Sequence, residues 1–370
     1  MEKHNILDVC DIYQPKTIST KEFIPDGEYS VYGANGIIGR YNFYNHENSE
    51  VLMACRGATC GTINISRPYS WINGNAMVIH PNGKFPIIQK YLAYYLEIAD
   101  KKEIISGTAQ PQITCNNMRD FKIPLCDISE QERIVARIEE LFSQLNSGME
   151  TLNTIKQQLT VYRQAVLHHV FSVCGTIKAN TVCQHISDGD HMPPPKTSSG
   201  IPFIMISNIR NNKINWNNTS FVGEDYYNAI SEKRTPHRGD VLYTVTGSYG
   251  IPVKVNFDNS FCFQRHIAIL RPNELISQDF LYYALQTPSV FQQVSKRATG
   301  TAQKTIGLTV LRDINIPYIS SRNEQDKLIR EIETRLSVCD NIENTVEITM
   351  QQTEALRQSI LKKAFEGRLI

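Results

Sequence analysis

The sequence predicts an α+β protein with two sheet-containing domains, separated by a pair of long antiparallel coiled-coil helices in a tandem repeat of pseudo-two-fold symmetry. The first observation is an internal repeat: residues 106–113 read SGTAQPQI and residues 299–306 read TGTAQKTI. The second is an apolar period of three or four residues over 129–172 and again over 322–370. The third is a series of short strand-like runs ahead of each of these segments.

The repeat extends beyond the two GTAQ segments. MRDFKIP at 118–124 matches LRDINIP at 311–317 in the same register, and after a one-residue slip SEQERIVARIEE at 129–140 matches NEQDKLIREIET at 323–334. These matches indicate a duplicated unit of about 190 residues. The expected boundaries are a first domain over 1–128, a helix over 129–172, a second domain over 173–321 and a helix over 322–370.

Each domain is expected to combine strands with a shorter helix. The first contains the runs VLMAC, TINIS and AMVIH, and the second contains IPFIMISNI, DVLYTVTG, VKVNF and HIAIL. A helical pattern follows each series, QKYLAYYLEIAD in the first domain and DFLYYALQTPSVFQQV in the second. Strands followed by a helix, twice, predict two α+β domains.

Each long helix carries one narrow apolar stripe. The spacing of Ser129 and Glu132 predicts a capping box at the first helix, and no proline interrupts 129–172. A helix of about 44 residues, roughly 65 Å long, cannot bury such a stripe against a small domain, but two stripes can bury each other. Pseudo-two-fold symmetry then requires antiparallel helices with a domain near each end, although pairing between chains is the alternative. The residues expected at the helix-pair interface are Ile138, Leu145, Leu152, Leu159, Val166, Ile332, Leu336, Ile342, Val346, Leu356 and Ile360.

Composition favours a cytoplasmic, globular protein. The hydrophobic fraction is 41%, no run of 18 apolar residues occurs, and the N-terminal segment lacks secretory or transit character. The nine cysteines are scattered without a CxxC pair, which argues against a disulfide framework and against a structural zinc site. We therefore expect reduced thiols and no metal site.

Charge permits a nucleic-acid partner without requiring one. The whole chain carries a net charge of +1, but residues 173–321 contain 14 basic and 10 acidic side chains, a local excess of four. Two inverted domains on a rigid spacer suit a symmetric object such as duplex DNA, in which equivalent groove faces recur about every 34 Å.

Several phrases together resemble the specificity subunit of type I restriction-modification systems. They are VYGANGIIGRY in the first domain, IPFIMISNIRNNKI, GDVLYTVTGSYG and FCFQRHIAILRP in the second, both GTAQ segments and the tail LRQSILKKAFEGRL. The resemblance covers essentially the whole chain, although VYGANGIIG has no counterpart in the second domain. It implies that 1–128 and 173–321 are target-recognition domains, each reading half of a bipartite double-stranded DNA site across a gap set by the helices.

The same resemblance implies partners and cofactors. The family's subunit holds two adenine methyltransferase subunits and, for cleavage, two motor-nuclease subunits. S-adenosylmethionine, magnesium and ATP are expected in those partners and no cofactor in this chain. The complex is expected in the cytoplasm, associated with the nucleoid.

Residues shared by both domains suit phosphate contact or folding, because phosphates carry no sequence information. In the GTAQ segments, Thr108 or Thr301 can hydrogen-bond a phosphate, and Gln110 and Gln303 can instead pair with adenine. A purely structural turn is the equal alternative.

Residues that differ at matched places suit base readout. Asn73 and Asn75 in WINGNAMVI align with Gln264 and His266 in FCFQRHIAIL, which also contains Arg265. Asn, Gln and Arg make bidentate contacts with purine edges in the major groove, whereas strand-entry turns also favour asparagine. The candidate cations for phosphate are Arg40, Arg56, Arg210, Lys213 and Lys304.

No catalytic signature is found. A GxxxxGK[ST] loop, an HExxH helix and a GxSxG elbow are all missing, and MPPPK at 192–196 is not the Asn-Pro-Pro-aromatic motif of an amino-methyltransferase. A non-catalytic DNA-specificity subunit is therefore the first hypothesis. The alternatives are a coiled-coil scaffold whose heads bind proteins rather than DNA, and a self-sufficient enzyme with an unrecognised site.

Overall fold

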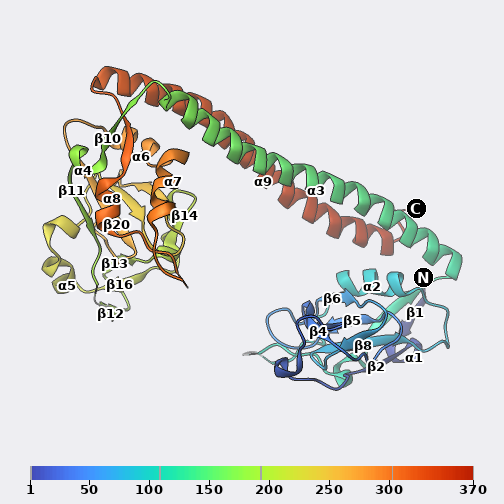
Figure 1. The fold of residues 1–370 in the computed structure, drawn as a ribbon. Helices are drawn as coiled ribbons and strands as arrows, with labels where there is room; N and C mark the ends of the chain where they lie inside the picture. The colour runs from blue at the N-terminus through green and yellow to red at the C-terminus, as the bar shows by residue number, and fades with distance from the viewer. Residues whose placement is uncertain (1, 108–109, 192–193, 302, 370) are drawn as a thin grey trace. The chain divides into compact units, whose positions relative to one another are not determined.

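The structure is a computed structural model that describes residues 2–107, 110–191, 194–301 and 303–369 (Figure 1). The chain divides into two compact units. Unit 1 comprises Met1–Leu152 with Glu347–Ile370, and unit 2 comprises Asn153–Val346. Each unit therefore contains its own sheets and one half of each long helix. The finer assignment of recognition domains and spacer helices stays a prediction.

Unit 1 is built on a four-stranded antiparallel sheet in the order β2-β8-β5-β6, next to a three-stranded sheet in the order β4-β3-β7. In the smaller sheet, β3 pairs with β4 antiparallel and with β7 parallel. A separate pair joins β1 to β9. The bounds are β1 Glu2–Asn5, β2 Cys10–Tyr13, β3 Tyr29–Gly33, β4 Gly36–Tyr41, β5 Val51–Ala54, β6 Ile63–Ile65, β7 Ser70–Ile72, β8 Ala76–Pro81 and β9 Lys122–Leu125.

The central strands of unit 1 are apolar throughout because both of their faces are covered. Val51 and Met53 of β5 pack in one cluster with Tyr91 of α2 (Gln89–Ile98). Leu52, which points to the opposite face, packs with Ile72 of the smaller sheet. The run VLMAC was thus a fully buried strand, for which an alternating polar pattern is not expected.

Unit 2 repeats the large sheet in the same order, β11-β20-β17-β18. Its second sheet has the order β12-β16-β13-β19, in which β13 pairs parallel with β19 as β3 does with β7. Two further antiparallel pairs are β10 with β21 and β14 with β15. The bounds are β10 Gly175–Lys178, β11 Cys183–Asp188, β12 Lys196–Thr197, β13 Ile201–Ile204, β14 Ile209–Arg210, β15 Lys213–Ile214, β16 Ser220–Val222, β17 Val241–Thr244, β18 Pro252–Lys254, β19 Cys262–Phe263, β20 Ile267–Pro272 and β21 Asn315–Tyr318.

The single helical pattern expected over DFLYYALQTPSVFQQV forms two helices, because Pro288 begins the second of them at a position where it needs no N–H partner. The short helices are α1 Ile6–Val9, α4 Ala179–Val182, α5 Glu224–Ala229, α6 Gln278–Ala284, α7 Pro288–Arg297 and α8 Leu308–Asp313, with 3-10 turns at Thr20–Glu22, Cys115–Met118, Ile206–Asn208 and Glu232–Arg234.

The two long helices are α3 (Ile128–Phe171) and α9 (Arg322–Phe365), each of 44 residues. In unit 1, Ile138 at the start of α3 shares a core cluster with Leu361 at the end of α9. In unit 2, Val166 at the end of α3 shares a cluster with Ile332 at the start of α9. The helices therefore run antiparallel. Within the described residues, neither they nor any other helix is long and apolar enough to cross a membrane.

The buried stripe of α9 corrects the predicted helix-pair interface at two positions. Ile342 and Leu356 are 40% and 48% exposed, whereas Val346 and Ile360 are buried. The stripe instead passes through the half-buried Glu343 and Arg357, at heptad spacing from Leu336 to Ala364. The predicted interface of α9 considered apolar residues only. Its register was therefore wrong, because the charged residues Glu343 and Arg357 occupy positions of the buried stripe, which we call the seam. On α3, Leu145, Leu152 and Leu159 are half-buried, and Ile138 and Val166 are buried.

A buried glutamine attaches each long helix to the sheets of its own unit. Gln131 donates from Nε2 to the carbonyls of Pro86 and Cys126, both at 3.0 Å, and accepts from the Ile88 amide at 2.9 Å. The repeat-related Gln325 makes the corresponding three bonds in unit 2. Both side chains are fully buried, so they fix where each helix begins.

Candidate nucleic-acid interface

Three segments of unit 2 meet where β17 ends. The Val245 amide donates to His266 O at 2.9 Å, the Ile306 amide donates to Val245 O at 2.7 Å, and the Gly247 amide donates to Lys304 O at 3.0 Å. These bonds join the end of β17, the loop between β19 and β20, and the second GTAQ segment. We call the described residues of 244–247, 264–267 and 299–306 junction 2.

Unit 1 contains the same arrangement where β5 ends. The Cys55 amide donates to Asn75 O at 3.1 Å, the Ile113 amide donates to Cys55 O at 3.0 Å, and the Gly57 amide donates to Pro111 O at 3.0 Å. We call the described residues of 54–57, 73–76 and 106–113 junction 1. The two junctions have the same backbone connections, bond for bond.

The shared glycine of the GTAQ segment has a backbone role. Gly107 has φ +86°, and a Cβ added there would lie 2.5 Å from Gln110 O; Gly300 has φ +106° and the corresponding distance to Gln303 O is 2.3 Å. Each turn is closed by reciprocal amide bonds, between Ser106 and Gln112 in unit 1. A side chain at either glycine would strain the turn, which explains this part of the repeat structurally.

The side chains that the junctions present are different. Arg56 is exposed in junction 1, whereas its counterpart Thr246 is buried and its hydroxyl lies 3.3 Å from Thr305 Oγ1. Pro111 corresponds to Lys304, and Asn75 corresponds to His266. One backbone scaffold thus carries two sets of donors, acceptors and charges.

A family model described as the type I restriction modification DNA specificity domain matches residues 1–160 and 188–352. The chain belongs to this family. Two of its relatives are the specificity subunits of the type I restriction enzymes EcoBI from Escherichia coli and MjaVIII from Methanocaldococcus jannaschii, at 25% and 24% identity. The first match covers 71% of this chain and 62% of the relative, and the second covers 87% and 79%.

The fold is similar to a solved structure as well. A chain in a structure describing complex assembly and conformational transition of the type I R-M system superposes with a TM-score of 0.70 at 18% identity. The match covers 99% of this chain and 98% of that one. At this identity the likeness concerns the fold.

In this specificity-family chain, junction 2 lines a hollow of about 420 Å³ that contains three of the predicted DNA-binding residues. Arg265, His266 and Gln303 contribute to its wall together with Asp188 and His191. Among the described residues, no hydrogen-bond partner is found for the side chains of Arg265 and Gln303, which are both exposed. Burial, followed by the nearby Arg265 charge, lowers the pKa of His266 below 6.5. A neutral imidazole there can both donate and accept a hydrogen bond.

Junction 1 brings Arg56, Asn75 and Gln110 to one place on unit 1, all three exposed. Thr108 lies outside the described residues, and Thr301 in the other segment is exposed. The prediction for Asn73 needs correction. This side chain is 3% exposed, its Oδ1 accepts from Ile18 N at 3.0 Å and Trp71 Nε1 at 3.1 Å, and its Nδ2 donates to Ile18 O. The side-chain amide of Asn73 is occupied by these hydrogen bonds within unit 1 and is not available to a base.

Three predicted cations, Arg40, Arg210 and Lys213, are not part of either junction. Arg40 lies on β4, where Nε donates to Gly27 O at 2.5 Å and Nη2 donates to Glu28 O at 2.9 Å, so its guanidinium is largely occupied by the backbone. Gln264 of junction 2 is half-buried; its backbone amide donates to Ile204 O and its carbonyl accepts from the Ile267 amide.

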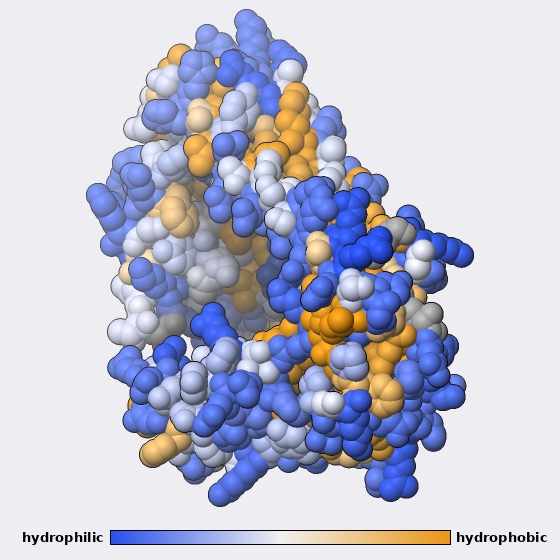
Figure 2. All heavy atoms as spheres, turned by 90° about the vertical axis from the view of Figure 1, so that its right-hand side faces the viewer, coloured by the Kyte–Doolittle hydropathy of each residue, from blue (hydrophilic) through white to orange (hydrophobic). Residues whose placement is uncertain are grey.

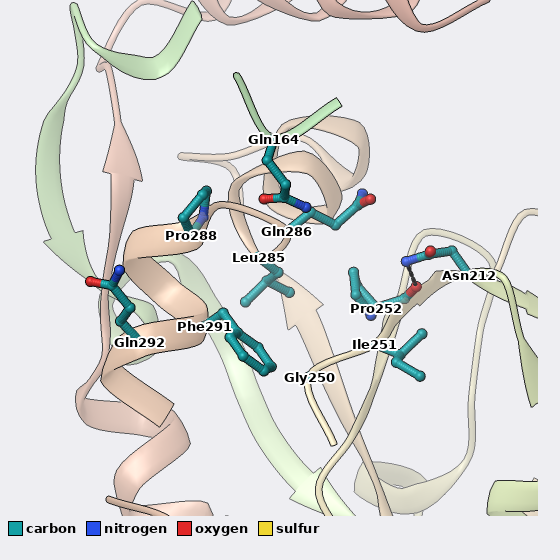
Figure 3. Close-up of a pocket in the computed structure, with 10 residues that line it drawn as sticks. All are labelled: Gln164, Asn212, Gly250, Ile251, Pro252, Leu285, Gln286, Pro288, Phe291 and Gln292. Atoms are coloured by element: carbon teal, nitrogen blue, oxygen red, sulfur yellow. Dashed lines mark hydrogen bonds between the residues drawn. The ribbon is translucent and has the colours of Figure 1, made fainter. Parts of the chain in front are cut away.

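Arg210 and Lys213 flank the β14–β15 turn, at Asn211 and Asn212, whose positive φ values of 49° and 58° suit a tight hairpin. Asn212 Nδ2 donates to Pro252 O at 3.0 Å, which holds the turn beside a second hollow of about 450 Å³ (Figure 3). Phe291 of α7 projects into this hollow, and none of its lining residues is charged. The second hollow is therefore unsuited to a phosphate.

The sequence reading missed several members of the junctions. Asp188 and His191, bonded to each other at 2.8 Å, reach junction 2 from the end of β11, more than 50 residues away along the chain. No local pattern marks them. The register of the repeat pairs Pro111 with Lys304, but a proline side chain has no donor or acceptor for a base.

Proposed function

We propose that the chain is the DNA-sequence-specificity subunit of a type I restriction-modification complex and reads a bipartite site, one half-site with each unit. The observation that supports this most directly is the pair of junctions, which share a backbone and differ in side chains. A scaffold that is repeated while its presented groups change suits two readers of two different base sequences. Membership of the DNA-specificity family supports the same proposal.

In unit 2, Arg265 and Gln303 are proposed to read base edges, because arginine pairs with guanine O6 and N7 and glutamine pairs with adenine N6 and N7. His266 is proposed to contact a base beside them. Lys304, which follows Gln303 in the chain, is proposed to neutralise a phosphate. In unit 1, Asn75 and Gln110 take the places of His266 and Gln303, and Arg56 adds a cation from the end of β5. Since these groups differ in charge and shape, the two half-sites are expected to differ in sequence.

The chemistry is proposed to reside in partner subunits. Two adenine methyltransferase subunits supply S-adenosylmethionine-dependent methylation, and two motor-nuclease subunits use ATP and Mg²⁺ to cleave unmodified DNA. Each target adenine has to be flipped out of the stack into a partner's pocket. This chain contributes binding and register, within a cytoplasmic, nucleoid-associated complex.

The helix pair offers a surface for such partners. In unit 2, Val161 and Tyr162 of α3 are 69% and 48% exposed, and Val338 and Ile342 of α9 are 56% and 40% exposed. On the face shown in Figure 2, hydrophilic residues predominate and apolar residues gather in patches. Exposed apolar side chains on two adjacent helices suit the packing of further helices from a partner.

The test is the pattern of methylated adenines in cells that express the chain with the methyltransferase of its own locus. We expect a bipartite motif with a constant gap that disappears when the gene for this chain is deleted. An unchanged methylome under conditions where both proteins are detected would contradict the proposal. A chain that binds proteins but shows no sequence-dependent binding to duplex DNA would support the scaffold alternative instead.

A further inference from the structure

The sheets of unit 1 are held to the long helices in two different ways. Along the chain, β9 leads directly into α3. By contrast, α9 begins at Arg322 in unit 2 and reaches unit 1 only as residues 347–370, which belong to it by packing. The contact between the end of α9 and the rest of unit 1 is therefore non-covalent.

That contact has a well-packed apolar part. Ile360, Leu361 and Ala364 are 6%, 0% and 1% exposed and lie in the core cluster of unit 1 with α2 and the start of α3. The Phe365 ring meets Tyr91 of α2 edge-on, with centroids 5.1 Å apart and an interplanar angle of 63°. It meets Tyr95 similarly at 5.3 Å and 65°. Edge-to-face pairs of this kind add to the energy of burial alone.

One helical turn before Leu361, the contact between α9 and α3 becomes polar. The Arg357 guanidinium lies over the Phe142 ring of α3, 4.0 Å from its centroid, and Nη1 donates to Asn146 Oδ1 at 3.2 Å. A cation on an aromatic face and one amide hydrogen bond stabilise a contact by less than a buried apolar side chain does. The contact is thus apolar and well packed around Phe365, and polar and less stabilising around Arg357.

We propose that Arg357, Ile360, Leu361 and Phe365 form a clasp, a set of positioning residues that hold the sheets of unit 1 on the end of α9. This inference rests on the proposed function, because the clasp would restrict unit 1 to one orientation and so restrict the gap between half-sites. With the clasp closed, the sheets of unit 1 are held by both α3 and α9. With the clasp open, these sheets are held by α3 alone and can turn about the start of that helix.

Unit 2 provides the matched control. Its repeat-related residues are Leu167, 2% exposed, and Phe171, whose ring meets Phe280 edge-on at 5.2 Å and 83°. Here, however, α3 continues into β10, and β10 pairs with β21, which leads into α9. Both helices are joined to one strand pair by the chain itself. Loss of the ring contact in unit 2 can therefore weaken the core without releasing a helix.

The experiment compares F365A and L361A with F171A and L167A, each in the full chain and in complex with the methyltransferase of the same locus. Hydrogen exchange at α2 is expected to rise about tenfold or more in F365A and L361A, since opening the clasp exposes its backbone. Selection of DNA from a library with the gap randomised should then return the same two half-sites with several gap lengths. F171A and L167A should retain a single gap length.

A second measurement does not depend on DNA. Fluorophores on non-canonical residues at the exposed positions Glu47 and Glu224 report the distance distribution between the units in the free chain. F365A should broaden it, and F171A should leave its width unchanged. An unbroadened distribution in F365A, or equal broadening in both variants, would overturn the clasp. A single retained gap length in F365A despite a broad distribution would show that the clasp does not set the gap. If the wild-type complex selects no bipartite site, the proposed function fails, and the distance distribution alone decides the clasp.

Discussion

Units 1 and 2 build their large sheets in the same strand order, yet they extend their second sheets differently. In unit 1, β3 has the hairpin partner β4, whereas in unit 2 the equivalent β13 pairs with β16, which pairs with β12 on its other side. The helix α7 and the hairpin β14–β15 also have no counterpart among the described residues of unit 1. The large sheet and one parallel strand pair of the second sheet are thus repeated, and the units differ in the strands and helices added around them.

Two repeat-related arginines in the helix pair, Arg163 and Arg357, also differ between the units. Arg163 in unit 2 pairs with Asp340 at 2.5 Å and Glu343 at 2.9 Å. Its repeat equivalent Arg357 in unit 1 has a ring and an amide in those places, Phe142 and Asn146. The same residue type therefore contacts two carboxylates in one unit and an aromatic ring and an amide in the other.

The largest expected effect tests the shared scaffold. Replacing Gln131 or Gln325 by leucine leaves three buried backbone groups without their partners and should lower the free energy of unfolding of the affected unit by about 3 kcal/mol. Urea unfolding of the full chain measures this. Q144L, on an exposed part of α3, is the control and should change little. A large loss of unfolding free energy in only one of the two variants would show that the two glutamines do not play equivalent roles.

The next effect tests the difference between the junctions. R265A should reduce discrimination between bases by about 2 kcal/mol at one position of one half-site, because the proposed bidentate contact with guanine would be lost. R56A should act on the other half-site or on phosphate binding. K304A should weaken binding to all sequences and reduce the salt dependence by about one unit of slope. Binding to single-base variants of the selected site measures all three, and a change in both half-sites from R265A would contradict the assignment.

A smaller effect tests the seam arginines. N146D gives Arg357 the carboxylate that Arg163 already has, and it should stabilise unit 1 by about 0.5 kcal/mol at low salt. D340N should destabilise unit 2 by a similar amount. Both changes should weaken near 1 M salt, because the Asp340 carboxylate is largely exposed and salt screens such charges. Thermal unfolding at two salt concentrations checks this, and a salt-independent effect would point to packing instead.

The smallest effect concerns pH. The ring of His185 in β11 has a buried Nε2 with no hydrogen-bond partner in the described structure. Burial, followed by the Arg271 charge, lowers the pKa of His185 below 6.5, although Asp240 opposes the shift. The unfolded chain therefore binds this proton more readily, and unit 2 should lose stability as pH falls below 6.5. H185Q should flatten this dependence below about pH 6.5. An unchanged slope would show that His185 does not control it.

Much of the fold was predictable, because a repeat and a helical period are encoded in local residue types. The two long helices and the paired α+β domains follow from such patterns, and so does the central sheet strand VLMAC. The seam through Glu343 and Arg357 did not follow, since a charged residue in a stripe is recognised only by what it contacts. Asn73 illustrates the same limit within the site: its residue type suits adenine, and only its bonds to Ile18 and Trp71 exclude that role.

The central claim is that two junctions with one backbone read two different half-sites. Sequencing methylated adenines in cells that carry either the wild-type chain or R265A, each with the methyltransferase of the locus, tests it most directly. The account predicts a bipartite motif of constant gap in the first case, and relaxed bases in only one half-site in the second. A single uninterrupted motif, or a motif altered in both halves by R265A, would contradict it.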